Sequence, residues 1–385
     1  MSLRINLNDL RSHLKFAPHS LTKPSPYIRC GILTNIERYN LLCPDIQIGF
    51  ITATHLQDHF PALNQSIDVD ATIIPNPELI DHLSALNPNE YITYENRVIA
   101  TFGEALNEVT YVGAPLVQLS NRWDLFKCNG EVLSLDFFLL TSTKKSQAIP
   151  SSCTLIGNPA FLFIEEGAII NASTLNVTTG PIYVAAHAEI MEGSLIRGPF
   201  ALCEYGQVKM GAKIYGATTI GPHCKVGGEV NNVVFEAYSN KSHDGFLGNG
   251  YIGSWCNIGA DTNASNLMNN YGIVDVHDYE TGKTTSSGEQ FVGLHMGDHS
   301  KCGINTMFNT GTVVGVSCNI FGSGFPRNFV PDFSWGGAHG FETYGLNKAF
   351  EVAEKVFERR GMDFNQVEKD ILTAVFEQTE GFRKY

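Results

Sequence analysis

Residues 182–228, IYVAAHAEIMEGSLIRGPFALCEYGQVKMGAKIYGATTIGPHCKVGG, repeat an aliphatic residue at every sixth position. The series is Val184, Ile190, Ile196, Leu202, Val208, Ile214, Ile220 and Val226. Small residues stand four positions after most of these, namely Ala188, Ser194, Gly206, Ala212, Thr218 and Cys224, with Phe200 as the exception. A period of six is typical of a parallel β-helix, in which three hexads form one triangular coil. Stacked coils then bury a continuous aliphatic column.

The same period returns twice in a shifted phase. The second series is Val234, Phe246, Ile252 and Ile258, with Asn240 as its polar member, and the third is Met296, Cys302, Phe308, Val314 and Ile320. One shift lies between Val226 and Val234. The other covers residues 264–290, which are rich in Asn, Thr, Ser and Gly and predict a loop inserted into the β-helix. Loops carried by rigid scaffolds often hold functional residues.

The regions outside the repeat predict two further parts. In residues 1–150, the segments IQIGFITA (46–53) and DATIIPN (70–76) predict strands, and PELIDHLSAL (77–86) predicts a helix that begins at a proline. This pattern indicates an α/β domain ahead of a β-helix domain over 151–343. In residues 344–385, two amphipathic segments (346–361 and 363–378) predict helices that cap or brace the β-helix, the first ending at Gly361.

Composition restricts the partners and the cellular setting. The chain has 385 residues and a formal net charge of −13, which argues against a nucleic-acid partner because phosphate binding needs a basic face. Its nine cysteines are scattered without CxxC pairs, which favours reduced thiols over disulfides or zinc. Neither a signal-peptide-like segment nor a membrane-spanning apolar run is evident. We therefore expect a cytoplasmic protein without a membrane partner.

Three segments resemble a known enzyme family. Residues 239–272, SNKSHDGFLGNGYIGSWCNIGADTNASNLMNNYG, resemble the acetyltransferase half of the bifunctional UDP-N-acetylglucosamine pyrophosphorylase/glucosamine-1-phosphate acetyltransferases. Residues 180–204 and 292–329 resemble more specifically a variant bacterial branch, whose N-terminal domain is a divergent sugar-nucleotidyltransferase-like domain. The resemblance implies a left-handed β-helix and a homotrimer with sites between subunits. It also implies N-acetylation of an amino-sugar phosphate such as glucosamine-1-phosphate by acetyl-CoA, on the route to UDP-N-acetylglucosamine, a cell-envelope precursor.

The resemblance assigns roles to individual residues. It implies His243 as the general base, Asn257 beside the sugar and acetyl group, and Asn270 and Tyr271 as contacts to acetyl-CoA. Lys225 and Lys241 are the nearest substitutes for two basic ligands of the sugar phosphate, and Phe246 stands at a family tyrosine position. Lys301 and Arg327 are further candidates for the phosphates of coenzyme A.

The chemistry of amine acetylation favours a histidine base independently of the family resemblance. The amine must lose a proton as it attacks the thioester, and histidine ionises near neutral pH. An amide such as that of Asn257 can stabilise the resulting oxyanion. We expect direct transfer, since Cys256 falls at a small corner position without features of an activated thiol. His243 lies three residues after Asn240, which predicts an outward-facing position, whereas the phase of Phe246 predicts an inward one.

Two other functions remain open at the level of sequence. His295, Asp298 and His299 in GLHMGDHSK (293–301) could ligate a metal, as in β-helix carbonic anhydrases of the zinc type. An anchor for the inserted loop, hydrogen-bonded through Asp298, is favoured, so no metal site is predicted. The other alternative is a non-catalytic module that binds a sugar nucleotide.

The first domain is the least defined. LTKPSPYIRCGILTNIERY (21–39) resembles the opening of the variant branch and offers Lys23 and Arg29 as phosphate contacts. Transfer of a uridylyl group from UTP, giving a UDP-sugar, would also need a carboxylate for Mg²⁺. Asp136 in LSLDFFLL is the candidate, with a buried structural role weighed against it. UTP and Mg²⁺ are thus expected only if nucleotidyl transfer is retained.

Overall fold

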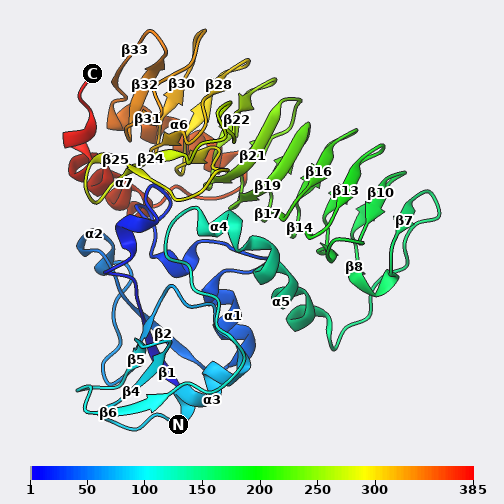
Figure 1. Cartoon of the computed structure of the whole chain (residues 1–385). Coiled ribbons are helices and arrows are strands. Elements are labelled where there is room, and N and C mark those ends of the chain that lie inside the picture. Colours follow the sequence, from blue (N-terminus) through cyan, green and yellow to red (C-terminus); the bar gives the residue numbers. More distant parts are fainter. Residues whose placement is uncertain (1) are drawn as a thin grey trace. The chain divides into compact units, whose positions relative to one another are not determined.

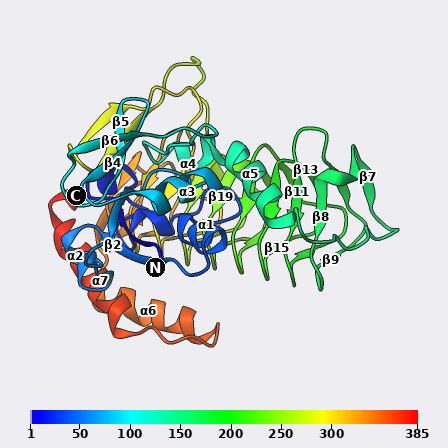
Figure 2. The same ribbon diagram turned by 90° about the horizontal axis from the view of Figure 1, so that it is seen from below.

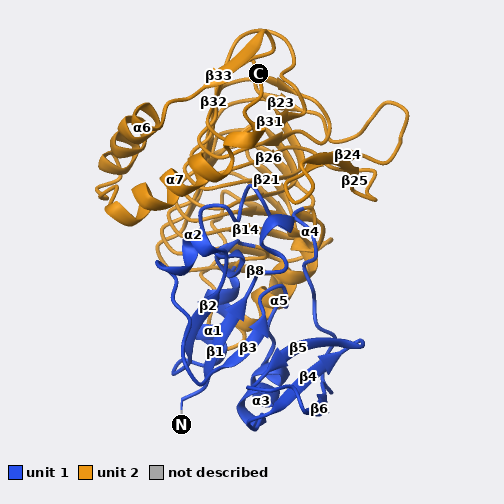
Figure 3. Cartoon of the chain, turned by 90° about the vertical axis from the view of Figure 1, so that its left-hand side faces the viewer, with its two compact units in different colours: residues 1–29, 33–122 blue, residues 30–32, 123–385 orange. Residues whose placement is uncertain are grey.

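The computed structural model describes residues 2–385, and these divide into two compact units (Figures 1 and 3). Unit 1 comprises residues 1–29 and 33–122, and unit 2 comprises residues 30–32 and 123–385. Residues 123–150, which the sequence analysis placed in the first domain, group instead with the β-helix. The predicted architecture, an α/β unit followed by a parallel β-helix and C-terminal helices, is confirmed.

Unit 1 is built around a six-stranded mixed sheet. Its order is β2 (Gln47–Ile51), β1 (Arg4–Asn8), β3 (Ile67–Asp70), β5 (Arg97–Thr101), β4 (Glu90–Tyr94) and β6 (Asn107–Thr110). The helical segments are η1 (His13–Lys15), η2 (Ser25–Tyr27), α1 (Asn35–Leu42), α2 (Thr54–Gln57) and α3 (Pro77–Ala85). Strands β2, β1 and β3 are parallel, so their carboxyl ends meet at one edge of the sheet.

Two of the three elements predicted in this unit are confirmed. The segment 46–53 forms β2, and 77–86 forms α3, where the Asn76 side chain accepts a hydrogen bond from the Leu79 N–H (2.8 Å). The strand predicted at 70–76 is wrong. Strand β3 ends at Asp70, because its carboxylate accepts hydrogen bonds from both the N–H and the hydroxyl of Thr72 and turns the chain.

Unit 2 stacks its coils along one axis, from β7 at one end toward α6 and α7 at the other (Figure 2). Its first face contains β7 (Thr154–Ile156), β10 (Thr174–Asn176), β13 (Leu195–Arg197), β16 (Lys213–Tyr215), β23 (Asn263–Ala264) and β28 (Met307–Phe308). Its second face contains β8 (Leu162–Ile164), β11 (Ile182–Val184), β14 (Phe200–Leu202), β17 (Thr218–Ile220), β26 (His295–Met296), β29 (Val313–Val314) and β31 (Phe329–Val330). Strands β19 (Glu229–Phe235) and β21 (Phe246–Ile252) bend continuously from the first face into the second.

The third face, called here the ten-stranded face, carries the candidate site. It consists of β9 (Ile169–Ile170), β12 (Glu189–Ile190), β15 (Gln207–Val208), β18 (Lys225–Val226), β20 (Asn240–Lys241), β22 (Asn257–Ile258), β27 (Lys301–Cys302), β30 (Asn319–Ile320), β32 (Ser334–Gly337) and β33 (Gly340–Thr343). Helices α4 (Asp124–Lys127) and α5 (Asn129–Thr141) precede the coils, and α5 lies on β14 and β17.

The first and third aliphatic series fill the core as predicted, and every member is buried. In the second series, Ile252 and Ile258 point into the core as predicted. Upstream of them, each inward residue comes one position later than predicted. Leu247, not Phe246, points inward, and Lys241 occupies the slot predicted for Asn240. The step from the inward residue Leu247 to the next one, Ile252, is five positions instead of six, so the coil is one residue shorter there. A one-residue slip exchanges the inward and outward faces of a strand.

Two C-terminal helices follow the last coil, as predicted. They are α6 (Leu346–Glu358) and α7 (Gln366–Gln378), followed by the short η4 (Glu380–Phe382). Helix α6 ends at a left-handed Gly361 (φ 68°), whose N–H donates to the Glu358 carbonyl, while the Met362 N–H donates to the Phe357 carbonyl. No helix in residues 2–385 combines the length and apolar character required to span a membrane.

The predicted insertion is confirmed between β23 and β26. It contains a hairpin of β24 (Asp275–Asp278) and β25 (Lys283–Ser286). The hairpin is fastened to the last coils, because the Tyr279 hydroxyl donates to the Asp332 carboxylate (3.1 Å) and the His277 ring stacks on Phe329 at 3.4 Å. Asp332 is fully buried and also accepts the Val316 N–H (2.6 Å). The buried Asp332 carboxylate and the stacked His277 ring thus tie the insertion to the β-helix.

We expect Asp332→Asn to stabilise the protein at pH 8 by about 1–3 kcal/mol. Burial raises the pKa of the Asp332 carboxyl from 3.8 to about 6, so the ionised form weakens the fold above pH 6. This penalty fades as the pH falls from 6 to below 3.8, where the folded and unfolded states are both protonated. Urea unfolding at pH 8 and pH 4.5 measures the difference, with the exposed Asp275→Asn as control. An equal effect at both pH values would contradict the account.

Candidate functional site

The ten-stranded face presents one outward side chain from each coil. Strand pairing aligns these residues in a single row: Glu189, Gln207, Lys225, Asn240, Asn257, Lys301 and Asn319. Successive coils are about 4.8 Å apart. Lys225 and Asn257 therefore flank Asn240, each one coil away, and His243 lies three residues beyond Asn240 at the corner that ends the face. The structure brings these three predicted residues, Lys225, Asn257 and His243, to one area.

His243 is exposed at a corner whose neighbour in the preceding coil is shortened. Six positions separate the inward residues Lys241 and Leu247, but only four separate Val226 and Val230 in the coil before. The short corner is made by Gly227 and Gly228. A Cβ on Gly228 would lie 2.8 Å from the His243 carbonyl oxygen, so only glycine fits there. The corner below His243 is consequently recessed.

The prediction that Lys241 contacts the substrate is wrong. Its side chain is 1% exposed and lies inside the β-helix, where Nζ donates to the carbonyls of Gly227 (3.1 Å) and His243 (2.8 Å). Burial lowers the pKa of Lys241 to about 8. In this position the ammonium cannot reach a sugar phosphate. It joins the recessed corner to the corner that carries His243.

Stacked aromatic rings, here called the aromatic ladder, form the opposite edge of the ten-stranded face. The rings are His187, Tyr205, His223, Tyr238 and Trp255, with successive centroids 5.0, 4.9, 4.7 and 4.2 Å apart. Each ring residue has a left-handed backbone, with φ between 54° and 62°. Phe357 of α6 stacks on the Trp255 end at 4.1 Å, whereas His187 and Tyr205 are exposed. The hexad count did not reveal this ladder, although His or Tyr recurring at 18-residue intervals from 187 to 223 was a usable signal.

Lys225 sits in a group of positive charges. Burial and the like charges of Arg360, Lys209 and Arg359 lower its pKa, in that order of effect, and Glu189 opposes them. The Lys209 ammonium donates to the Gln207 side chain (2.9 Å), which in turn donates to Glu189 (2.9 Å). Sequence reasoning found Lys225 but missed Lys209 and the two arginines at the end of α6.

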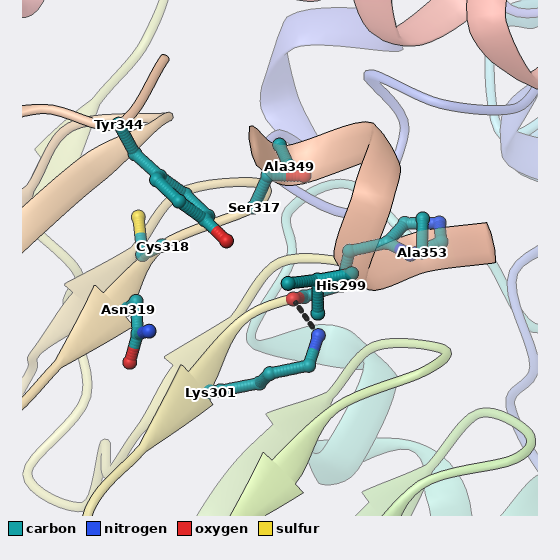
Figure 4. A pocket seen from close by; sticks show the side chains of 9 residues that line it. His299, Lys301, Ser317, Cys318, Asn319, Tyr344, Ala349 and Ala353 are labelled. Atoms are coloured by element: carbon teal, nitrogen blue, oxygen red, sulfur yellow. Dashed lines mark hydrogen bonds between the residues drawn. The ribbon is translucent and has the colours of Figure 1, made fainter. Parts of the chain in front are cut away.

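Lys301 lies farther along the row, beneath α6. The pocket there has a volume of about 10 Å³, and His299, Asn319, Tyr344 and Ala353 are among its lining residues (Figure 4). The Lys301 ammonium donates to the His299 carbonyl (2.8 Å), and burial lowers its pKa to about 8, although part of the side chain still reaches solvent. A pocket of this volume holds about one water. A phosphate of coenzyme A therefore does not fit beside Lys301 in this structure.

The other residues predicted to bind coenzyme A lie elsewhere in unit 2. Asn270 and Tyr271 are exposed on the insertion, which leaves the β-helix after β23, at a different corner from His243. Figure 3 shows the β24–β25 hairpin and α6 on opposite sides of the β-helix. Arg327 donates to the Lys384 carbonyl (3.5 Å) and lies over the rings of Phe341 and Tyr385. One chain does not assemble these three residues around His243.

Phe246 and Cys256 were both assigned positions from the hexad phase, and their surroundings in the structure are as follows. Phe246 pairs with Glu229 in an outward register and is half-buried, so the predicted inward position is wrong. Cys256 is buried, and burial raises the pKa of its thiol to about 12, which keeps it protonated at neutral pH. A protonated thiol is a poor nucleophile.

The cluster considered for metal binding is dispersed. The His295 ring faces Phe126, with ring centroids 5.8 Å apart, and the Asp298 carboxylate accepts a hydrogen bond from the Ser254 N–H (2.8 Å). The His299 ring instead stacks on Phe357 of α6. In residues 2–385, no group of three or more His, Cys, Asp or Glu side chains is arranged to hold a metal ion. This Asp298 contact joins two coils of the β-helix and does not involve the insertion over residues 264–290, so its role as a loop anchor stays a prediction.

Unit 1 contains a second cavity of about 770 Å³ at the carboxyl ends of β1 and β3. Its lining includes the cations Arg11, Lys15 and Arg97 and the carboxylates Asp68 and Asp70. Ligands of open α/β sheets commonly bind at this edge. Neither Lys23 nor Arg29 lines the cavity. The predicted phosphate contact of Arg29 is wrong, because its side chain is buried and ion-paired with Glu37 (3.1 Å).

Asp136, the candidate magnesium ligand, has a structural role on α5. It is 1% exposed, and its carboxylate accepts the Ile32 N–H (2.7 Å). Nearby, the Asn129 side chain accepts the Gly31 N–H (2.7 Å) and donates to the Ala217 carbonyl (2.7 Å). Asp136 thus fastens residues 30–32 to α5, and Asn129 links them to the β-helix.

Comparison with family models finds a match in the N-terminal part of the chain that extends past the end of unit 1 at residue 122. A family model described as sugar nucleotidyl transferase matches residues 5–145. Similar solved structures include the polySia specific acetyltransferase NeuO, with 12% identity, a TM-score of 0.25, and coverage of 50% of this chain and 86% of that chain. A UDP-N-acetylglucosamine acyltransferase from Campylobacter jejuni has 15% identity, a TM-score of 0.25, and coverage of 61% and 95%.

A third similar structure is a mutant of AntD, an N-acyltransferase from Bacillus cereus, in complex with dTDP and coenzyme A. Its identity is 10%, its TM-score 0.23, and its coverage 54% of this chain and 90% of that chain. A search of curated proteins finds no match to the sequence. At these TM-scores, similarity to the solved structures carries no argument about activity, so function must be argued from the site.

Proposed function

We propose that the protein is an acyltransferase that uses acetyl-CoA to N-acetylate an amino-sugar phosphate, with His243 as general base. The observation that carries the proposal is the exposed imidazole at a recessed corner, within two coils of a cationic group and an outward asparagine. The resemblance of residues 239–272 and the sugar nucleotidyl transferase model that matches residues 5–145 support a sugar substrate.

Each residue has a step in the proposed reaction. The amine attacks the thioester carbonyl, His243 takes the amine proton, and the Asn257 amide donates to the oxyanion. Collapse breaks the C–S bond and releases coenzyme A, whose thiolate takes up a proton. Lys225 attracts the phosphate of the acceptor. No acyl-enzyme is involved, consistent with the protonated, buried thiol of Cys256.

The proposed assembly is a homotrimer with its sites between subunits. The first face supports it, because a cavity of about 760 Å³ there is lined by apolar side chains such as Ile156, Leu195 and Tyr215. Ile156 and Leu195 are 43% and 53% exposed. In a trimer, Asn270 and Tyr271 of one subunit could approach His243 of another, which analytical ultracentrifugation followed by a structure with coenzyme A would test.

The test of the activity is a direct assay. Purified protein is incubated with acetyl-CoA and a panel of amino-sugar phosphates and unphosphorylated amino sugars, and release of the free thiol is followed. We expect turnover only with phosphorylated amines. Absence of thiol release with every acceptor would contradict the proposal and favour a binding module.

A second proposed function is nucleotide binding by unit 1, supported by the three cations in its 770 Å³ cavity and by the family match. The two carboxylates in the cavity already accept hydrogen bonds, Asp68 from Asn6 and Asp70 from Thr72, so we derive no step through Mg²⁺. UTP or a UDP-sugar is the proposed ligand.

We expect the Arg11→Gln and Arg97→Gln double variant to weaken UTP binding by about tenfold or more, because each guanidinium can form charge-assisted hydrogen bonds to phosphate. Isothermal titration calorimetry measures the affinity. Arg4→Gln, at the opposite end of β1, is the matched control. Equal affinity in the double variant and the wild type would place the nucleotide elsewhere.

A further inference from the structure

Four cations at or beside the ten-stranded face form no ion pair with a carboxylate. They are Lys209, Lys225, Arg359 and Arg360, and none of them forms an ion pair within residues 2–385. Elsewhere in unit 2, Lys213, Lys355 and Lys369 are each ion-paired with a glutamate at 2.7 to 2.9 Å. Clustered like charges repel one another, so the arrangement favours a bound anion.

Rigid contacts hold these charges in place. Lys225 on β18 and Lys209, directly after β15, belong to neighbouring coils of the ten-stranded face. The Lys209 ammonium donates a hydrogen bond to the Gln207 side-chain oxygen (2.9 Å). Phe357, stacked on Trp255 at 4.1 Å, fastens the last turn of α6 to the ladder just before Arg359 and Arg360. The Gly361 turn ends the helix immediately after them. Packing therefore positions the backbone that carries the two arginines, in contrast to arginines on a free tail.

Ring stacking brings the end of α6 to the ladder, because Phe357 stacks on Trp255 (4.1 Å), Trp255 on Tyr238 (4.2 Å) and Tyr238 on His223 (4.7 Å). Burial, and after it the like charge of Arg360, lower the pKa of both Lys225 and His223, in agreement with this placement. His223 is a ring of the ladder, and Lys225 follows it by two residues. Lys225 thus lies near the ladder edge, whereas Lys209 aligns with Gly227 and Ser242 at the edge that carries His243, two coils before it.

We propose that Lys209, Lys225, Arg359 and Arg360 form a subsite for a phosphate monoester dianion. The inference deepens the proposed function and rests on it for the identity of the ligand. Two ligands of that reaction carry such a group, namely the amino-sugar phosphate and coenzyme A through its 3′-phosphate. Arginine pairs bind phosphate in a bidentate manner, and lysines add point charges. The subsite would fix the distance between the bound phosphate and His243.

The test compares two matched pairs of probes by isothermal titration calorimetry. The pairs are coenzyme A with dephospho-coenzyme A, which lacks the 3′-phosphate, and glucosamine-1-phosphate with glucosamine. The variant is the Arg359→Gln and Arg360→Gln double substitution, and Lys355→Gln on the same helix is the control. A second variant, Lys209→Gln with Lys225→Gln, removes the charges from the coil wall without touching α6.

We expect both double variants to bind the phosphorylated member of one pair about tenfold more weakly, with the unphosphorylated member unchanged. The affected pair identifies the source of the phosphate. Unchanged affinity for all four probes in both variants would overturn the subsite. Phosphate-dependent binding without any thiol release by the wild type would support the subsite and overturn the acyltransferase proposal, so the two failures are distinguishable.

Discussion

Replacement of His243 by alanine is expected to lower the rate of acyl transfer by about 10²–10⁴-fold, the range that a general base contributes. His243 is exposed, so its truncation leaves no cavity in the core. Its carbonyl, which accepts the Lys241 ammonium (2.8 Å), is retained in the variant. The corner should therefore keep its shape, and KM for both substrates should change far less than kcat.

The measurement is steady-state thiol release over a range of both substrates, with thermal unfolding as a check on the fold. His339→Ala is the matched control, because His339 is also an exposed histidine in a turn of unit 2, between β32 and β33. Near-normal kcat in His243→Ala would remove the histidine from the chemistry. An equal loss in His339→Ala would indicate a general effect on the protein.

The β-helix could be predicted from the sequence because its core is a strictly local pattern. Each coil repeats the same inward position, so the first and third series name the buried residues correctly. The prediction failed where the coil length changes. Counting in sixes placed Asn240 and Phe246 inside, whereas Lys241 and Leu247 are there, because the step from Leu247 to the next inward residue is five positions.

The candidate site was predicted only in part, since it combines distant parts of the chain. His243, Asn257 and Lys225 follow from one face of the repeat, and the structure brings them together. Arg359 and Arg360 reach the same area through the packing of α6, which no local pattern reveals. Lys241 illustrates the converse: a lysine beside a candidate base suggests a ligand contact, yet its side chain fills a core slot and bonds to two carbonyls.

The aromatic ladder connects stability to the proposed anion subsite. Its rings compensate for left-handed backbone conformations, which cost about 1–2 kcal/mol in residues other than glycine. Trp255, the last ring of the ladder, joins it to α6, since it stacks on Tyr238 at 4.2 Å within the β-helix and on Phe357 of α6 at 4.1 Å. Removing this ring should therefore loosen both the corner and the helix that carries Arg359.

Trp255→Ala is expected to destabilise unit 2 by about 3–5 kcal/mol, the usual loss for a buried tryptophan. Trp255→Gly removes the same ring and relieves the strain at φ 62°, so it should be less destabilising than alanine by about 1 kcal/mol. Urea unfolding of both variants measures the difference, and equal losses would contradict the role of backbone strain. Because Phe357 loses its partner in both, the affinity for the phosphorylated probe should fall in both, although no charge has been removed. Wild-type affinity in the alanine variant would show that α6 is positioned without the ladder, and the four cations would then need another explanation for their proximity.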